Sequence, residues 1–148
     1  MEGVLKISEA ANLGVHAMVY LLEAGLERTI AVAEIAGVLG VSKDHLGKVL
    51  QRLAKAGLVT SRRGPRGGFR LNDGAGEATL LEILEAIDGP MANETCLFGH
   101  PICGGRCIMG GLMISVNQMV HDYLSTTRLS DMAVLSPLAR RLRQEQSG

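Results

Sequence analysis

Residues 62–71 read Arg-Arg-Gly-Pro-Arg-Gly-Gly-Phe-Arg-Leu, and this run limits the possible folds more than any other part of the chain. Its glycines and proline favour a tight turn and exclude a continuous helix. The flanking segments 58–61 and 68–71 have the length and apolar content of short strands. We therefore predict a β-ribbon whose tip, between Arg62 and Gly67, carries arginine side chains.

Three helical segments are predicted before this ribbon. Apolar residues recur at helical spacing over 8–24, and a shorter segment over 32–39 ends at Gly40. Ser42 is a favourable N-cap for a third helix that continues to Gly57. A short helix, a glycine turn and a capped helix form a helix-turn-helix. With the ribbon as its wing, this part of the chain predicts a winged helix.

The second half of the chain is expected to contain less regular structure. Residues 80–88 predict a brief helix, and the Gly-rich stretch 90–111 cannot form a simple one. An amphipathic helix is predicted over 112–126, followed by a further helical turn at 129–135 and a basic tail at 137–146. Helices are therefore predicted on both sides of the ribbon, and the irregular stretch 90–111 interrupts those on its C-terminal side.

Composition supports a mainly α fold. Hydrophobic residues make up 47% of the chain and aromatic residues only 3%, so the core must consist chiefly of aliphatic and methionine side chains. We expect a winged-helix DNA-binding domain at 1–73 and a cysteine-loop sensor and dimerisation region at 74–148. The apolar stripe over 112–126 predicts packing against a second copy in a homodimer. The alternative is that this helix folds back onto the winged helix.

Charge is balanced overall but unevenly distributed. The chain has 15 Lys and Arg and 15 Asp and Glu. Between residues 42 and 70, however, eight basic residues stand against one acid, Asp44. A solvated helix face would explain basic residues on the third helix, whereas the arginine-rich turn that follows favours contact with nucleic acid. The sequence has no secretory signal pattern and no long uncharged apolar stretch, so we expect a cytoplasmic protein without a membrane anchor.

Two segments supply the predicted DNA contacts. The first turns of the third helix normally enter the major groove, where side chains meet base edges or phosphates. The wing tip would lie against a phosphate backbone or in a minor groove, where arginine is favoured. The candidate residues are Ser42, Lys43, Asp44, His45 and Lys48 on the helix, and Arg63, Gly64, Arg66, Gly67 and Gly68 on the wing.

The cysteines form a second candidate site. The chain has three, Cys96, Cys103 and Cys107, an odd number in a chain without a secretory signal. Metal binding or redox chemistry is therefore favoured over a disulfide framework. With His100, the three thiols would make a complete ligand set for structural zinc. A small thiol oxidoreductase is a further alternative, although the segment has neither a Cys-x-x-Cys pair nor a βαβ pattern around it.

The chain resembles the Rrf-two (Rrf2) family of bacterial winged-helix regulators, which includes iron-sulfur cluster regulators and nitric-oxide-sensitive repressors. The resemblance covers about Leu5 to Ala133. It is carried by the opening Lys-Ile-Ser, the Gly-Val-Ser before the third helix, Leu-Ala-Lys-Ala-Gly-Leu-Val, the wing Arg-Gly-Pro-Arg-Gly-Gly-Phe-Arg-Leu and the downstream cysteines. It implies a homodimer that binds a pseudo-palindromic operator in double-stranded DNA, with half-sites about one helical turn apart.

The resemblance also implies a cofactor. Three thiolates suit an iron-sulfur cluster with one further ligand, which in this family often comes from the first helix of the partner subunit. The matching residues here are His16, the better donor, and Asn12; His100 is a local alternative. The gap of three residues between Cys103 and Cys107 is shorter than the family's usual gap of about five. Either a 2Fe-2S or a 4Fe-4S cluster therefore remains open, and zinc or redox thiols are the alternatives.

Overall fold

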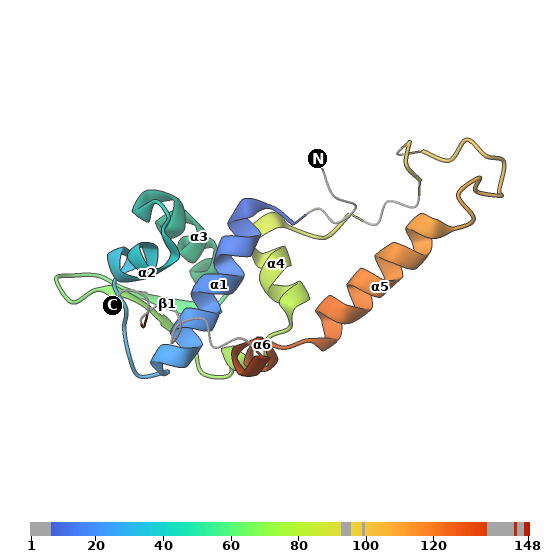
Figure 1. Ribbon diagram of the computed structural model, residues 1–148. Helices are drawn as coiled ribbons and strands as arrows, with labels where there is room; N and C mark the ends of the chain where they lie inside the picture. Colours follow the sequence, from blue (N-terminus) through green and yellow to red (C-terminus); the bar gives the residue numbers. More distant parts are fainter. Residues whose placement is uncertain (1–6, 93–95, 99, 136–143, 145–146) are drawn as a thin grey trace.

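A computed structural model describes residues 7–92, 96–98, 100–135, 144 and 147–148; most of the basic tail predicted at 137–146 lies outside them. The elements, shown in Figure 1, are α1 (Glu9–Ala24), α2 (Val32–Leu39), α3 (Lys43–Lys55), β1 (Val59–Arg62), β2 (Gly68–Leu71), a 3-10 helix η1 (Ala75–Glu77), α4 (Leu80–Asp88), α5 (Leu112–Thr126) and α6 (Leu129–Leu135). Within these ranges no helix is long and apolar enough to cross a membrane.

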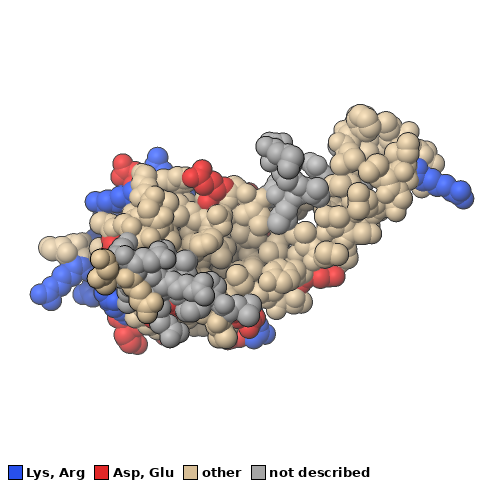
Figure 2. Space-filling view, viewed as in Figure 1, with Lys and Arg blue, Asp and Glu red and all other residues tan. Residues whose placement is uncertain are grey.

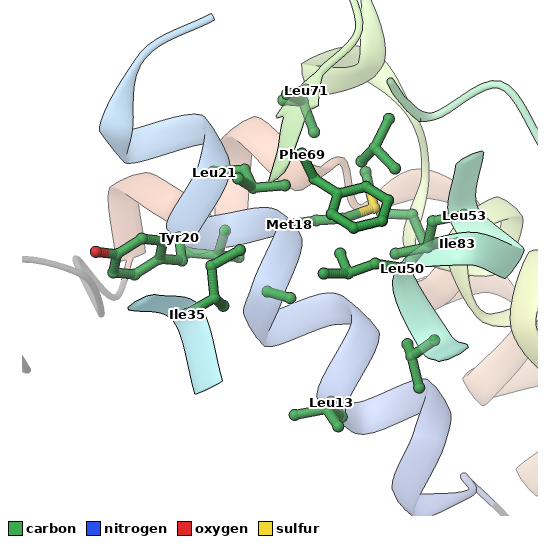
Figure 3. Close-up of a cluster of buried hydrophobic side chains, with 14 of the residues drawn as sticks. Leu13, Met18, Tyr20, Leu21, Ile35, Leu50, Leu53, Phe69, Leu71 and Ile83 are labelled. Atoms are coloured by element: carbon green, nitrogen blue, oxygen red, sulfur yellow. The ribbon is translucent and has the colours of Figure 1, made fainter. Parts of the chain in front are cut away.

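Helix α1 lies at the centre of the core. Ser8 caps its N-terminus, since the Ser8 hydroxyl accepts a hydrogen bond from the Ala11 N–H at 2.9 Å. Its apolar side chains pack against α3, α4, α6 and β2. Figure 3 shows Met18 and Leu21 of α1 facing Phe69, Leu50 and Ile83. The core is built largely from aliphatic side chains, as the low aromatic content requires.

Helices α2 and α3 form the helix-turn-helix. Gly40 ends α2 in the left-handed conformation, with φ of 67°, which a glycine adopts without strain. Ser42 then caps α3 by accepting from the His45 N–H at 3.4 Å. The buried face of α3 consists of Leu46, Val49, Leu50 and Leu53. This face fixes α3 against the core and leaves its opposite face open to the surroundings.

The wing is an antiparallel ribbon of β1 and β2. Val59 is paired with Leu71 and Arg62 with Gly68. The segment before α2 joins the ribbon, because Ile30 and Phe69 exchange two backbone hydrogen bonds of 2.8 Å. The wing is therefore attached to the helix-turn-helix through backbone hydrogen bonds as well as through the buried side chains of its inner face.

Helices α4 and α6 complete the core, whereas α5 extends from it. Thr79 and Glu82 form a capping box at the start of α4. Helices α4 and α6 pack on α1, and backbone hydrogen bonds join their first residues: the N–H of Leu80 donates to Thr127 and the N–H of Leu129 to Ala78. Figure 1 shows α5 projecting away from the winged helix, with the cysteine segment at its far end.

The predicted fold class is confirmed. The chain is mainly helical with a two-stranded antiparallel sheet, and its helices and wing lie close to their predicted ranges. The alternative in which α5 folds back along the winged helix is not what the structure has: α5 contacts α4, and Leu124 is its only buried residue. The division of the chain near residue 73 and the role of α5 in dimerisation stay predictions.

Candidate nucleic-acid interface and cysteine segment

The polar face of α3 forms an open surface. Lys43, Asp44 and Lys48 are exposed there, and His45 is half-buried. This face borders an open hollow of about 660 Å³ between α3, the start of α2 and the wing. The residues lining the hollow are Val32, Lys43, Asp44, Gly47, Lys48, Gln51, Arg52 and Phe69. Three of the predicted contact residues therefore share one concave surface.

The same surface contains residues that the sequence analysis missed. Gly47, Gln51 and Arg52 line the hollow beside the predicted lysines. Residues 44, 47, 48 and 51 recur at the spacing of one helix face, opposite the buried leucines and valine. This periodicity was available in the sequence. Gly47 and Gln51 carry no charge, so the basic pattern does not identify them, whereas Arg52 is one of the eight basic residues between 42 and 70.

Ser42 has an established structural task. Its hydroxyl accepts the His45 N–H and caps α3. The side chain is also exposed, so its hydroxyl can still donate its own hydrogen to a phosphate oxygen. The residue therefore combines a cap with a position at the edge of the polar face.

The wing presents its basic side chains at the tip and along its outer face. Arg63 and Arg66 are exposed. The strand register places Arg62 and Arg70 on the face opposite the buried Phe69, and both are exposed as well. These two arginines extend the surface predicted from the turn alone. Figure 2 shows basic side chains gathered at the end of the molecule that carries the wing, whereas the α5 end is mostly uncharged.

The glycines of the wing have structural reasons of their own. A Cβ on Gly67 would lie 2.3 Å from the Arg62 carbonyl oxygen, and one on Gly68 would lie 2.0 Å from that of Ile30. Gly64 has φ of 108° with open space around it. The backbone packing of the ribbon thus accounts for Gly67 and Gly68 without DNA, and their predicted DNA contacts remain untested.

The cysteine segment is exposed and loosely organised. Its thiols are free, Cys96 being half-buried and Cys103 and Cys107 exposed. The Cys96 thiol donates to the His100 carbonyl oxygen at 3.1 Å, and turn hydrogen bonds follow, including Gly110 N–H to the Cys107 oxygen at 2.9 Å. Among the described residues, no three Cys, His, Asp or Glu side chains converge on a common point. The zinc set with His100 is therefore not assembled within one chain.

His16 and Asn12 lie on the exposed side of α1. The His16 Nδ1 is 2.7 Å from the Asn12 backbone oxygen. A carbonyl oxygen can only accept, so in the neutral ring Nδ1 carries the proton and Nε2 keeps a free lone pair. A hydrogen bond of this kind orients many histidine ligands toward a metal. Thiols and an imidazole with a free ring nitrogen are ligand types that iron accepts.

Comparison with known families gives one clear match. The model of the family Rrf2, described as an iron-dependent transcriptional regulator, matches residues 7–134. Among curated proteins, the transcriptional regulator IscR of Photorhabdus laumondii is 28% identical over 130 residues, covering 86% of this chain and 79% of that protein. IscR of Xenorhabdus nematophila is 27% identical over 129 residues, with the same coverage.

Solved structures agree with this match. CymR, the global cysteine regulator of B. subtilis, superposes with a TM-score of 0.75 at 26% identity, covering 89% of this chain and 98% of CymR. IscR of T. potens superposes with a TM-score of 0.67 at 26% identity, covering 86% and 85% of the two chains. The similarity therefore extends over the winged helix and α5 together, and not over the DNA-binding part alone.

Proposed function

This chain belongs to the Rrf2 family of transcriptional regulators, and we propose that it is a homodimer whose operator binding is controlled by an iron-sulfur cluster. Its relatives are regulators of transcription, so the chain is a DNA-binding regulator and not an enzyme. The thiol oxidoreductase alternative is thereby wrong. We place its action on cytoplasmic DNA, as the bacterial family implies.

The observation that carries this proposal is the position of the two basic segments. The polar face of α3 borders the hollow, which Phe69 of the wing also lines, and the wing's arginines are exposed to the surroundings. In a winged helix, this arrangement lets α3 enter a major groove while the wing contacts the adjacent backbone or minor groove. Two such surfaces in a symmetric dimer would meet a pseudo-palindrome with half-sites about one helical turn apart.

The exposed apolar face of α5 supports the dimer. Leu112, Met119 and Tyr123 are 48%, 73% and 55% exposed, and they lie on one side of the helix. Apolar side chains exposed in this continuous arrangement mark an interaction surface. Packing of α5 on its own copy would bury this surface and would bring the cysteine segment of one subunit toward the other.

The proposed ligands of the cluster are the three cysteine thiolates together with His16 of the partner subunit. Asn12 is a weaker alternative, because a neutral amide binds iron poorly. His100, which lies in the same exposed segment as the thiols, is the local alternative. An iron-sulfur cluster would supply redox and nitric-oxide chemistry at this position. The family description as iron-dependent supports iron over zinc.

Control of operator binding requires only a small difference in the free energy of DNA binding between the protein with its cluster and the protein without it. Ligation of the thiols would order the segment before α5, and a histidine from the partner would tie that segment to α1. A coupling free energy of about 1–3 kcal/mol, typical of allosteric effectors, changes DNA affinity by roughly 5- to 150-fold. Such a difference is sufficient to switch occupancy of an operator.

Anaerobic purification followed by visible spectroscopy and analysis of iron, acid-labile sulfide and zinc tests this proposal. We expect broad visible absorption with iron and sulfide in stoichiometric amounts, and loss of both in Cys103→Ser. A colourless protein with one zinc per chain would instead support a structural site. Apo protein that binds neither metal, and whose DNA binding responds to oxidants, would support redox thiols.

The fourth ligand is tested by His16→Ala, with His121→Ala as the matched control because His121 is an exposed histidine on α5. The His16 variant should keep its fold but show an altered spectrum and faster loss of the cluster in air. The control should behave as the wild type. An unchanged spectrum in the His16 variant would place the fourth ligand elsewhere.

A further inference from the structure

Asp44 is an acid at the centre of a basic surface. It lines the hollow beside Lys43 and Lys48, and it is the single acid between residues 42 and 70. Its carboxylate is exposed, and none of the described residues pairs with it. A carboxylate at a DNA-facing surface is repelled by phosphates, so it weakens binding unless it meets a hydrogen-bond donor. The donors that DNA offers in the major groove are the amino groups of bases.

Gly47 lies one turn further along the same face. Glycine is the least favoured helix residue after proline, and position 47 is in the interior of α3. Neither packing nor backbone conformation calls for it. A Cβ would have no atom within 4 Å, and the residue has no positive φ. Gly14 in α1 differs, because a Cβ there would lie 2.2 Å from the Ile87 Cδ1. The missing side chain at position 47 therefore leaves room for something outside the chain.

We propose that Asp44 and Gly47 together form a base-reading position of α3 that selects cytosine. The Asp44 carboxylate would accept a hydrogen bond from the N4 amino group of cytosine, the base whose major-groove edge presents only a donor. Gly47 would let the helix backbone approach the same or the neighbouring base pair closely. This inference rests on the proposed DNA-binding function and adds a base identity to it.

The principal competing explanation is local. Asp44 is in the first turn of α3, where an acid interacts favourably with the helix dipole. Under that explanation, Asp44 would have no part in DNA recognition. Its removal would then strengthen binding to every duplex, because one repulsive charge would be lost. Under the proposal, removal weakens binding to the operator while leaving or strengthening binding to unrelated DNA. The two explanations thus predict opposite changes in affinity for the operator when the Asp44 carboxylate is removed.

The experiment uses duplexes selected by the wild-type protein from a library with a randomised core, together with one unrelated duplex of equal length. Asp44→Ala should bind the selected duplex about 5- to 150-fold more weakly and should tolerate replacement of one C·G pair in each half-site. Binding to the unrelated duplex should not weaken. Glu9→Ala is the matched control, since Glu9 is an exposed acid in the first turn of α1. It should leave discrimination between the duplexes unchanged.

Gly47→Ala tests the second residue independently of charge. The variant should be at least as stable to heat as the wild type, yet should bind the selected duplex several-fold more weakly. Gly37→Ala is its control, because Gly37 is an exposed glycine inside α2 with no atom within 4 Å of a built Cβ. This control should gain similar stability with wild-type DNA affinity.

The possible outcomes separate this inference from the proposed function. If the wild type selects no duplex and shows no salt-sensitive DNA binding, the proposed function fails. If the wild type selects a duplex but Asp44→Ala binds it as tightly or more tightly, the base-reading role is overturned while DNA binding stands. The base-reading role would also be overturned if the Asp44 variant tolerated replacement of none of the C·G pairs in the selected duplex.

Discussion

Arg52 of α3 donates a hydrogen bond from Nη1 to the carbonyl oxygen of Ile87, at 3.2 Å, in the last turn of α4. The end of α4 is held from a second side, because the Ser8 hydroxyl donates to the Asp88 carboxylate at 2.7 Å. The Ile87 side chain occupies the space left by Gly14 of α1. The chain leaves α4 here and continues to the cysteine segment. Helix α3 is therefore linked to the residues from which the cysteine segment begins.

Replacement of Arg52 should loosen this link. Arg52→Met keeps an apolar stem of similar length but removes the donor, leaving a carbonyl at the end of α4 without its partner. We expect a loss of about 1 kcal/mol in the free energy of unfolding, since the bond involves a charged donor but is only partly buried. Urea denaturation measures it. Lys55→Met, an exposed basic residue in the same last turn of α3, is the control and should change stability by less than about 0.5 kcal/mol.

The Arg52→Met variant also addresses regulation, in combination with Cys103→Ser. Because Arg52 also lines the hollow, a lower DNA affinity alone would not show coupling. The informative quantity is the effect of Cys103→Ser on DNA affinity, measured with Arg52 and with Met at position 52. We expect a smaller effect in the Met background. An equal effect in both backgrounds would show that the cysteine segment influences α3 by another route.

Most of the fold could be predicted from the sequence because its signals are local. Ser42 and Gly40 mark helix ends by capping chemistry, and the periodic apolar residues of α1, α3 and α5 identify helices without knowledge of their partners. The wing was predicted from turn residues, and its strands begin within one residue of expectation.

Long-range contacts could not be predicted. Nothing local indicates that Ile30 pairs with Phe69, or that Arg52 reaches Ile87. The DNA contact predicted for Gly68 stays a prediction, but nothing local indicates that its backbone also lies against Ile30, a partner 38 positions earlier. The cysteine ligand set rests on the family resemblance, since the described residues of one chain do not assemble a metal site. A ligand from the partner subunit, as proposed for His16, would leave no local spacing from which the fourth ligand can be recognised.

The position of Gly68 predicts a large effect on stability. A Cβ at this residue would lie 2.0 Å from the Ile30 carbonyl oxygen, and its φ of 151° is one that other residues rarely adopt. Gly68→Ala should therefore lower the free energy of unfolding by about 2–4 kcal/mol through strain and weakened bridge hydrogen bonds. Gly64→Ala, where only the positive φ is unfavourable, should lower it by about 1–2 kcal/mol. Equal losses in the two variants, measured by urea denaturation, would contradict the role given to Ile30.

Arg66 at the wing tip should contribute to DNA affinity through phosphate contact. Arg66→Ala is expected to weaken binding to all sequences and to reduce the slope of log affinity against log salt by about 1, because one fewer counterion is released. Titrations over a range of salt concentrations measure this slope. Arg106→Ala is the control, an exposed arginine in the cysteine segment away from the wing. An unchanged slope for the Arg66 variant would remove this side chain from the interface.

Helix α5 should hold the dimer through its exposed apolar face. Met119 is 73% exposed within one chain, on the same side of the helix as Leu112 and Tyr123. In a dimer packed through this face, Met119→Glu would bury an unpaired carboxylate beside its own copy, which weakens association by several kcal/mol. His121→Glu adds the same charge on the opposite side of α5 and should remain dimeric. Sedimentation equilibrium distinguishes the two variants.

A monomeric Met119 variant should also lose much of its affinity for the two-half-site operator while keeping its affinity for a single half-site, because each winged helix would then bind alone. A fully dimeric Met119 variant would place the subunit contact on another surface.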